Sequence, residues 1–222
     1  MMKAAQSFQP DGIVVMGDLA DFYAVSDFSK DPARANRLDE ELEDVEAGLD
    51  ELDALGAVNK VFCAGNHCDR LRRFLQDNAP QLHKRLTVPK LLHLERRGWI
   101  YVPYRQDIKI GKMYFTHAVG KAGRSSVFQC ADTYQHSVIT GHTHRLAYVV
   151  EGDATGKAKL SAQFGWLGDV TKADYMHQIK ARRDWALGFG VGYLDPTTQV
   201  VHVTPVPIVN YTCVVEGRAY RG

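Results

Sequence analysis

The first half of the chain alternates between short apolar runs and amphipathic segments. Residues 13–16 form a continuous apolar run, as expected of a strand that is covered on both faces. Residues 34–55 carry leucine and valine at spacings of four and three, which draws one apolar stripe along a helix, and Gly56 follows as a helix end. A strand over 58–64 and a short helix over 70–78 come next. The pattern therefore predicts the order strand, helix, strand, helix.

The second half of the chain has a different pattern, with short apolar stretches and few helical periodicities. Residues 108–117 predict a hairpin that turns at Gly111-Lys112, and Val138-Ile139 predicts the core of another strand. Further β-type stretches follow at 146–150, 158–164, 187–194 and 200–206. The whole pattern predicts an α/β fold whose second half is a predominantly antiparallel sheet. Because no repeat or linker interrupts it, we expect a single domain over residues 1–222.

Four of the predicted strands end at residues that can bind a metal. In α/β sheets the loops after the strands converge on one crevice, so we expect these residues to lie close together. Oxygen and imidazole donors without thiolate favour Mn, Fe or Zn in a catalytic rather than a structural site. The four segments are Gly17-Asp18, Gly65-Asn66-His67, Thr116-His117 and Gly141-His142-Thr143-His144.

These motifs occur in an order that resembles the calcineurin-like metallophosphoesterases. The residues that carry the likeness are Gly17-Asp18-Leu19-Ala20-Asp21, Gly65-Asn66-His67, the isolated His117 and Gly141-His142-Thr143-His144. Residues 18–32, residues 185–195 and the C-terminal strands are similar to a phage- and bacterium-encoded subgroup of phosphoesterases. The resemblance implies a four-layer αββα sandwich of two mixed β-sheets flanked by helices. It also implies two metal ions, divalent or trivalent, in the active site.

The resemblance also assigns a role to each motif residue. Asp18 would bridge the two ions, and Asn66, His117 and His142 would complete the protein ligands of one ion, while His144 would bind the other. In the family, two ions roughly 3.5 to 4 Å apart generate a hydroxide that attacks phosphorus. The implied reaction is the hydrolysis of a phosphate ester.

The remaining assignments concern the groups around the metal. By the same resemblance His67 is the catalytic histidine, which stabilises the transition state or protonates the leaving oxygen, and Asp21 braces its loop by hydrogen bonding. Arg70 lies close enough in sequence to reach a phosphate oxygen, although a salt bridge on a helix surface is an equal alternative. Cys68 occupies a position where the family usually has an acidic residue, and Asp69 comes one residue late.

The chain departs from the family pattern at its start. The family begins with a strand that carries an Asp-x-His motif, whereas the 17 residues before Asp18 contain no histidine, and Asp11 stands in a Pro-Asp-Gly turn. We therefore expect a fold without the family's first strand and a second metal held only by Asp18 and His144, so that one ion binds instead of two. The interpretations are a truncated reading frame, a single-metal enzyme, a non-catalytic relative, or a strand supplied by a partner chain.

Composition limits the classes of function and the cellular compartment that we expect for this protein. The formal net charge is +1, so no bulk attraction to nucleic acid or to a membrane is indicated, and a nuclease would need a basic groove that the sequence does not show. The four cysteines form no CxxC pair, which favours reduced thiols, and no apolar run is long enough for a membrane span, so we expect a cytoplasmic protein. A metal-binding but catalytically impaired remnant, or an interaction protein, is the alternative function. The oligomeric state stays open.

Overall fold

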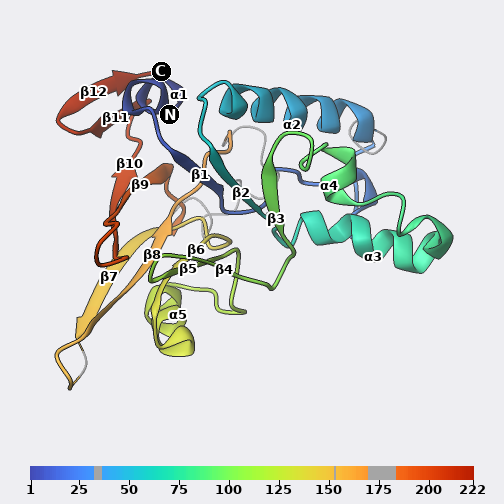
Figure 1. The fold of residues 1–222 in the computed structure, drawn as a ribbon. Coiled ribbons are helices and arrows are strands. Elements are labelled where there is room, and N and C mark those ends of the chain that lie inside the picture. The colour runs from blue at the N-terminus through green and yellow to red at the C-terminus, as the bar shows by residue number, and fades with distance from the viewer. Residues whose placement is uncertain (33–36, 153, 170–183) are drawn as a thin grey trace. The chain divides into compact units, whose positions relative to one another are not determined.

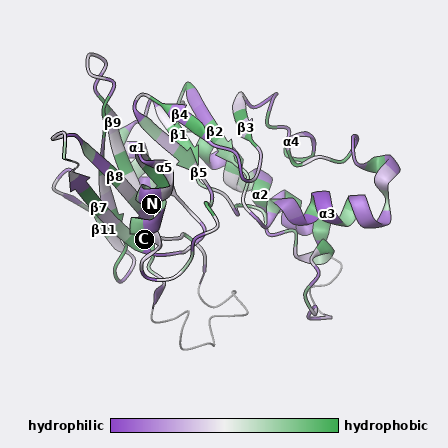
Figure 2. Ribbon diagram, turned by 90° about the horizontal axis from the view of Figure 1, so that it is seen from below, coloured by the Kyte–Doolittle hydropathy of each residue, from purple (hydrophilic) through white to green (hydrophobic). Residues whose placement is uncertain are grey.

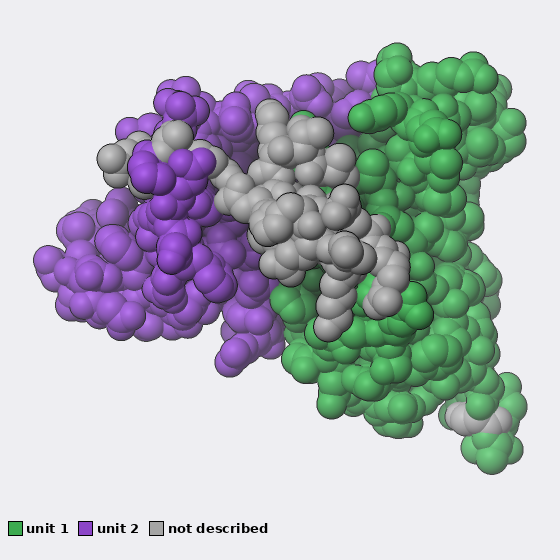
Figure 3. Space-filling view, turned by 180° about the vertical axis from the view of Figure 1, so that it is seen from behind, with its two compact units in different colours: residues 1, 3, 107–222 green, residues 2, 4–106 purple. Residues whose placement is uncertain are grey.

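The computed structural model describes residues 1–32, 37–152, 154–169 and 184–222. Over these residues the fold is mixed α/β, with five α-helices and several separate β-sheets (Figure 1). The chain divides into two compact units, shown in different colours in Figure 3. Unit 2 contains residues 2 and 4–106, and unit 1 contains residues 1, 3 and 107–222. Each unit positions some of the predicted site residues.

Unit 2 is built on a three-stranded parallel sheet in the order β1-β2-β3. The strands are β1 (Gly12–Val15), β2 (Asn59–Cys63) and β3 (Trp99–Val102). In the register, Val14 lies opposite Val61, and Val61 lies opposite Ile100. The predicted strands at 13–16 and 58–64 are confirmed, whereas β3 was not predicted.

The helices of unit 2 are α1 (Met2–Phe8), α2 (Leu38–Asp53), α3 (Cys68–Asn78) and the short α4 (Val88–Leu91), with 3-10 turns η1 (Tyr23–Val25) and η2 (Pro80–Leu82). Helices α2, α3 and α4 contribute apolar residues to the buried core that includes this sheet. Leu49 of α2 and Leu71 of α3 join the buried core around Phe62. Figure 2 shows the outcome on α3, where hydrophilic and hydrophobic residues alternate along the helix. The predicted helix at 34–55 is confirmed from Leu38, while residues 34–36 lie outside the described part.

Gly56 ends α2 as the sequence predicts. Its backbone adopts a φ of +76°, which is accessible to glycine at little cost, and its N–H donates to the carbonyl of Asp53. The acidic residues of α2 lie largely on its exposed face. The apolar stripe packs inward, as expected for an amphipathic helix on a sheet.

Unit 1 contains a five-stranded sheet in the order β4-β5-β6-β8-β7. The strands are β4 (Ile108–Ile110), β5 (Met113–Thr116), β6 (Ser137–Thr140), β7 (Leu146–Gly152) and β8 (Ala158–Phe164). The hairpin predicted at 108–117 is confirmed, with Ile110 opposite Met113 and Gly111 in the turn at a φ of +55°. Two antiparallel pairs complete the unit: β9 (Gly188–Leu194) with β10 (Val201–Pro207), and β11 (Thr212–Val215) with β12 (Arg218–Arg221).

Most strand pairs of the second half are antiparallel, as predicted, but the centre of the five-stranded sheet is parallel. Strands β5, β6 and β8 run parallel, and only the outer strands β4 and β7 are antiparallel to their neighbours. The reason is the helix α5 (Ser126–Tyr134), which lies between β5 and β6 and packs against β6 and β8. A helical crossover returns the chain in the same direction, and so makes a parallel pair. The sequence analysis did not predict this helix.

Two smaller expectations can be compared with the structure. All four cysteines are free and buried, so the prediction of unpaired thiols is confirmed. In the described part of the chain, none of the helices combines the length and the apolar character needed to cross a bilayer. The single-domain prediction over 1–222 stays a prediction.

Candidate metal centre

Asp18 lies in the loop after β1, in a strained backbone that packs directly on a glycine. The φ angles of Gly17 and Asp18 are 106° and 56°, and the second is an uncommon conformation for a residue other than glycine. Asp18 Oδ1 accepts a hydrogen bond of 2.9 Å from the backbone N–H of His67. A Cβ on Gly65 would lie 1.9 Å from the same Oδ1. The Gly-Asn-His segment therefore requires glycine because the aspartate occupies the space of a side chain.

His67 begins the turn that leads into α3 and is held by a carboxylate. Its Nδ1 lies 2.6 Å from Oδ1 of Asp21, and its Nε2 lies 3.8 Å from Oδ2 of Asp18. Because the Asp21 carboxylate accepts a hydrogen bond from Nδ1, this contact fixes the ring orientation and turns Nε2 toward Asp18. Asp21 was predicted to brace its loop by hydrogen bonding, and the structure adds that it contacts the predicted catalytic histidine.

Arg70 completes this charged group. Its Nη1 donates to the backbone carbonyl of Asp21 over 2.9 Å and also to the Asp21 carboxylate. The arginine is only 7% exposed, and its guanidinium carbon lies 5.6 Å from the centre of the Phe28 ring. Burial raises the pKa of Asp21, but the hydrogen bond and charge of His67, together with Arg70, outweigh it and leave this pKa below its ordinary value. Contact between Arg70 and a substrate stays a prediction.

The two residues after His67 face away from its ring. Oδ1 of Asp69 lies 2.6 Å from Nε of Arg72, and Oδ2 lies 3.8 Å from Nε of Arg73, on the helix surface. Cys68 is buried, its thiol lies 3.9 Å from the carbonyl oxygen of Ala20, and desolvation raises its pKa to about 12. The carboxylate that contacts His67 therefore comes from the β1 loop.

In unit 1, two histidines follow neighbouring parallel strands. His117 directly follows β5 and is 2% exposed, and His142 lies in the loop after β6. Their ring centroids are 5.2 Å apart, with the rings edge to face, and one nitrogen of each ring lies within 4.8 Å of the other. The backbone N–H of Gly141 donates to the carbonyl of His117 over 3.0 Å, which ties the two loops together. The parallel pairing of β5 and β6 thus brings these predicted ligands side by side.

His144 has an aromatic environment. Its ring stacks on Trp166 with centroids 5.5 Å apart and an interplanar angle of 8°, and meets Trp185 edge to face at 4.0 Å. Its backbone carbonyl accepts a hydrogen bond of 2.9 Å from Ala186. The contact of the two tryptophans with a predicted ligand has no signal in the sequence.

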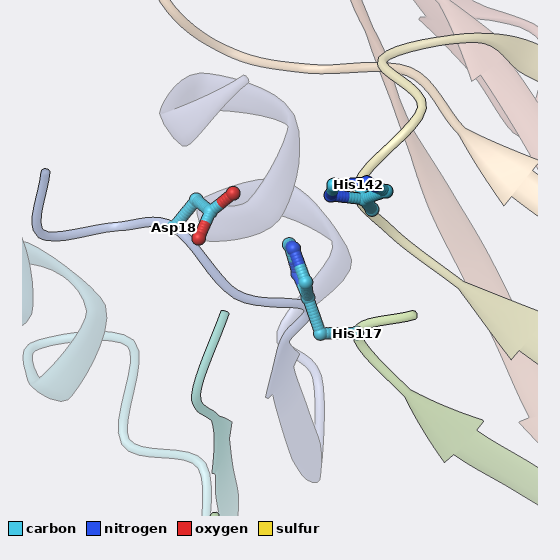
Figure 4. A group of neighbouring side chains, drawn as sticks. All are labelled: Asp18, His117 and His142. Atoms are coloured by element: carbon cyan, nitrogen blue, oxygen red, sulfur yellow. The ribbon is translucent and has the colours of Figure 1, made fainter. Parts of the chain in front are cut away.

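Among the residues that the structure describes, Asp18, His117 and His142 form a group that could hold a metal ion (Figure 4). They offer one carboxylate oxygen and two imidazole nitrogens, a donor set that suits Mn, Fe or Zn. His144 lies outside this group. Asn66 is half-buried between β2 and α3, and its role as a ligand stays a prediction.

Sequence reasoning missed one buried residue beside the histidine loops. Gln163 of β8 is 1% exposed and accepts a hydrogen bond of 2.8 Å from the hydroxyl of Thr143, between His142 and His144. A glutamine within a short strand has no pattern that distinguishes it from a surface residue.

The search of known families and curated proteins found no family model that matches this chain and no curated protein similar to it.

Proposed function

We propose that this protein hydrolyses phosphate esters and belongs with the calcineurin-like metallophosphoesterases. The observation that supports the proposal most is the donor group of Asp18, His117 and His142, each of which directly follows a β-strand or lies in the loop after one. In this proposal Asp18, His117 and His142 would hold one metal ion, which is Mn, Fe or Zn. The fold would be the four-layer αββα sandwich of the family, without its first strand.

The chemistry divides between the ion and the chain. A bound ion would polarise the phosphate and activate a water molecule as the nucleophile. His67 would donate a proton from Nε2 to the departing ester oxygen, because Asp21 holds the opposite nitrogen of its ring at 2.6 Å. Arg70 would maintain this arrangement by its hydrogen bond to the Asp21 carbonyl, and would also contact a phosphate oxygen. The substrate class is a phosphomonoester or phosphodiester.

A single metal ion is the stoichiometry that we favour. His144, which the family resemblance assigns to the second ion, is packed against two indole rings, outside the group that could hold a metal. With Asp18 and His144 alone, a second ion would have too few protein ligands for tight binding. A metal-binding protein with impaired catalysis is the alternative that follows from the same observation.

The test is hydrolysis of an aryl phosphate ester with added Mn²⁺. We expect turnover that a chelator abolishes, and that His142→Ala and Asp18→Asn each remove. His202→Ala, which changes an exposed histidine on β10, is the matched control and should leave turnover unchanged. Turnover that survives both site substitutions would show that the assigned residues are wrong.

Metal titration separates the alternatives. One bound ion with turnover supports the proposed single-metal enzyme, and two bound ions with turnover support the family arrangement. One ion without turnover supports the impaired, metal-binding protein. No bound ion in the unsubstituted protein would overturn the metal site itself.

A further inference from the structure

A row of buried polar residues crosses the ends of the three parallel strands of unit 1. In the strand register Thr116 of β5 lies opposite Thr140 of β6, and Thr140 lies opposite Gln163 of β8. All three are at most 2% exposed. Thr116 directly precedes His117, and Thr140 directly precedes Gly141, which begins the loop of His142. The row therefore lies at the base of both loops that carry the proposed ligands.

Gln163 connects the row to its surroundings through the hydroxyls of Thr140, Thr143 and Ser126. Its Nε2 donates to the hydroxyl of Thr140 over 3.2 Å, and its Oε1 accepts from Thr143 over 2.8 Å. The hydroxyl of Ser126, at the start of α5, lies 3.1 Å from both ends of the amide. An amide buried without partners is costly, whereas these bonds satisfy both its donor and its acceptor. The network thus connects β6, β8, α5 and the histidine loop.

The loop that the network holds is strained. His142 and His144 have φ angles of 66° and 58°, in the left-handed region that disfavours residues with a side chain. Such a conformation is unfavourable for these residues and persists only where the surrounding structure holds it. Within the loop, the N–H of Thr143 donates to the carbonyl of Gly141 over 2.7 Å. The Thr143 hydroxyl is the side-chain link between this strained segment and the buried network.

We propose that Gln163 and Thr143 are positioning residues for metal binding. The hydrogen bond between them holds the loop with His142 in its strained conformation, so that the imidazole is preorganised beside His117. Residues that orient metal ligands without touching the metal typically change affinity by about 10- to 100-fold when they are removed. The inference rests on the proposed metal site, and it adds two residues that the family resemblance does not assign.

The decisive comparison is Thr143→Val against Thr143→Ser in the full chain, with Co²⁺ as the probe. Thr143→Val keeps the shape of the side chain and removes the hydroxyl, so we expect Co²⁺ binding to weaken by about 10- to 100-fold and its visible absorption to change. Thr143→Ser retains the hydroxyl and should restore both readouts to within about threefold of the unsubstituted protein.

Ser126→Ala is the matched control for a purely structural role. It removes another hydrogen-bond partner of Gln163 but leaves the bond from Thr143 in place. We expect a lower melting temperature and unchanged Co²⁺ affinity. In the metal-free protein, hydrogen exchange should accelerate at the amides of Gly141 and position 143 in Thr143→Val, and not in Ser126→Ala.

The outcomes distinguish two failures. Equal Co²⁺ affinity and spectra for Thr143→Val and the unsubstituted protein would overturn the positioning role alone. Equal losses in Thr143→Val and Thr143→Ser would do the same, because the hydroxyl would then be irrelevant. A lack of Co²⁺ and Mn²⁺ binding by the unsubstituted protein would overturn the proposed metal site, and the positioning role with it.

Discussion

The loops of unit 2 and those of unit 1 hold their predicted functional residues by different forces. In unit 2, His67 is held by the carboxylate of Asp21, which also forms an ion pair with the guanidinium of Arg70. In unit 1, the loop of His142 is held by a neutral hydrogen bond from Thr143, and the ring of His144 packs against two indoles. His67 is therefore held by charge, whereas these contacts of the histidine loop are neutral, with the ion pair of Arg145 and Asp184 beside them.

Residues with strained backbone conformations are stabilised by different contacts in the two units. Asp18 in unit 2 and His142 in unit 1 both have positive φ angles, of 56° and 66°. Strain of this kind is common at functional sites and is sustained by the surrounding structure. Asp18 is held by close packing on Gly65 and a backbone hydrogen bond from His67. Substitutions should accordingly have effects of different size and different pH dependence in the two halves.

The largest effect is expected for Gly65→Ala. The added methyl group would lie 1.9 Å from Asp18 Oδ1 and 2.6 Å from the backbone N of Asp18, so the β1 loop would have to move. Overpacking of this severity costs roughly 2 to 3 kcal/mol in the free energy of unfolding. Chemical denaturation measures this loss, and metal titration should show weaker binding because Asp18 is displaced.

Gly48→Ala is the control for that substitution. Gly48 lies inside α2, and a Cβ at this position would meet no atom within 4 Å. Alanine in a helix interior is more favourable than glycine by roughly 0.5 to 1 kcal/mol, so this variant should be more stable than the original chain. If Gly65→Ala were as harmless as Gly48→Ala, the close packing of Asp18 on Gly65 would be disproved.

An intermediate effect is expected for Asp21→Asn, which removes the charge from the unit 2 group. The amide keeps an oxygen for Arg70 but loses the anion that holds His67, and we expect a loss of roughly 1 kcal/mol in the free energy of unfolding near neutral pH. Turnover should fall as well, because Nδ1 of His67 loses its charged partner. Thr143→Ser, which introduces no charge change, is the comparison from unit 1.

The lowered pKa of Asp21 determines how the stability difference between Asp21→Asn and the original chain changes with pH. The pKa of Asp21 is lower in the folded chain than its ordinary value, so the folded state prefers the carboxylate. The stabilisation is complete above the ordinary pKa of 3.8 and is lost as the pH falls through the lower, folded value. Asp21→Asn should therefore remove part of the acid sensitivity of unfolding, and its difference from the original chain should shrink in acid. A difference that stays constant down to the acid transition would contradict the assignment.

The sequence predicted the strands that carry the site but not the contacts that arrange it. The apolar runs before Asp18, Asn66 and His142 stand out locally, and each became a strand of the predicted kind. The parallel centre of unit 1 was not predicted because α5 is short and its apolar residues are mixed with polar ones. Helix existence in such a segment is decided by packing on β6 and β8, which the sequence alone does not display.

For the candidate site, too, the sequence predicted the residues but not the contacts between their side chains. The donors Asp18, His117 and His142 were predicted from residue type and position after a strand. Asp21 and His67 are 46 residues apart in the sequence, and Thr143 and Gln163 are 20 residues apart. Such pairs are fixed only by the tertiary fold, so a sequence pattern contains no signal for them.

The smallest effect is expected for Trp185→Phe, which tests how far aromatic packing supports His144. The indoles of Trp166 and Trp185 have centroids 5.2 Å apart, close enough for coupled electronic transitions that give an exciton couplet in circular dichroism. The phenyl ring should retain part of the packing on His144, so we expect a loss of roughly 0.5 to 1 kcal/mol in the free energy of unfolding and disappearance of the couplet. Because the substitution removes no charge, the loss should not vary with salt, unlike that of Asp21→Asn.

Trp99→Phe is the control, because Trp99 lies in unit 2 with its indole N–H bonded to Asp53, and its removal should leave the couplet in place. A couplet that survives Trp185→Phe would contradict the contact between these rings, whereas a salt-dependent loss would show that the substitution also disturbs the neighbouring ion pair of Arg145 and Asp184.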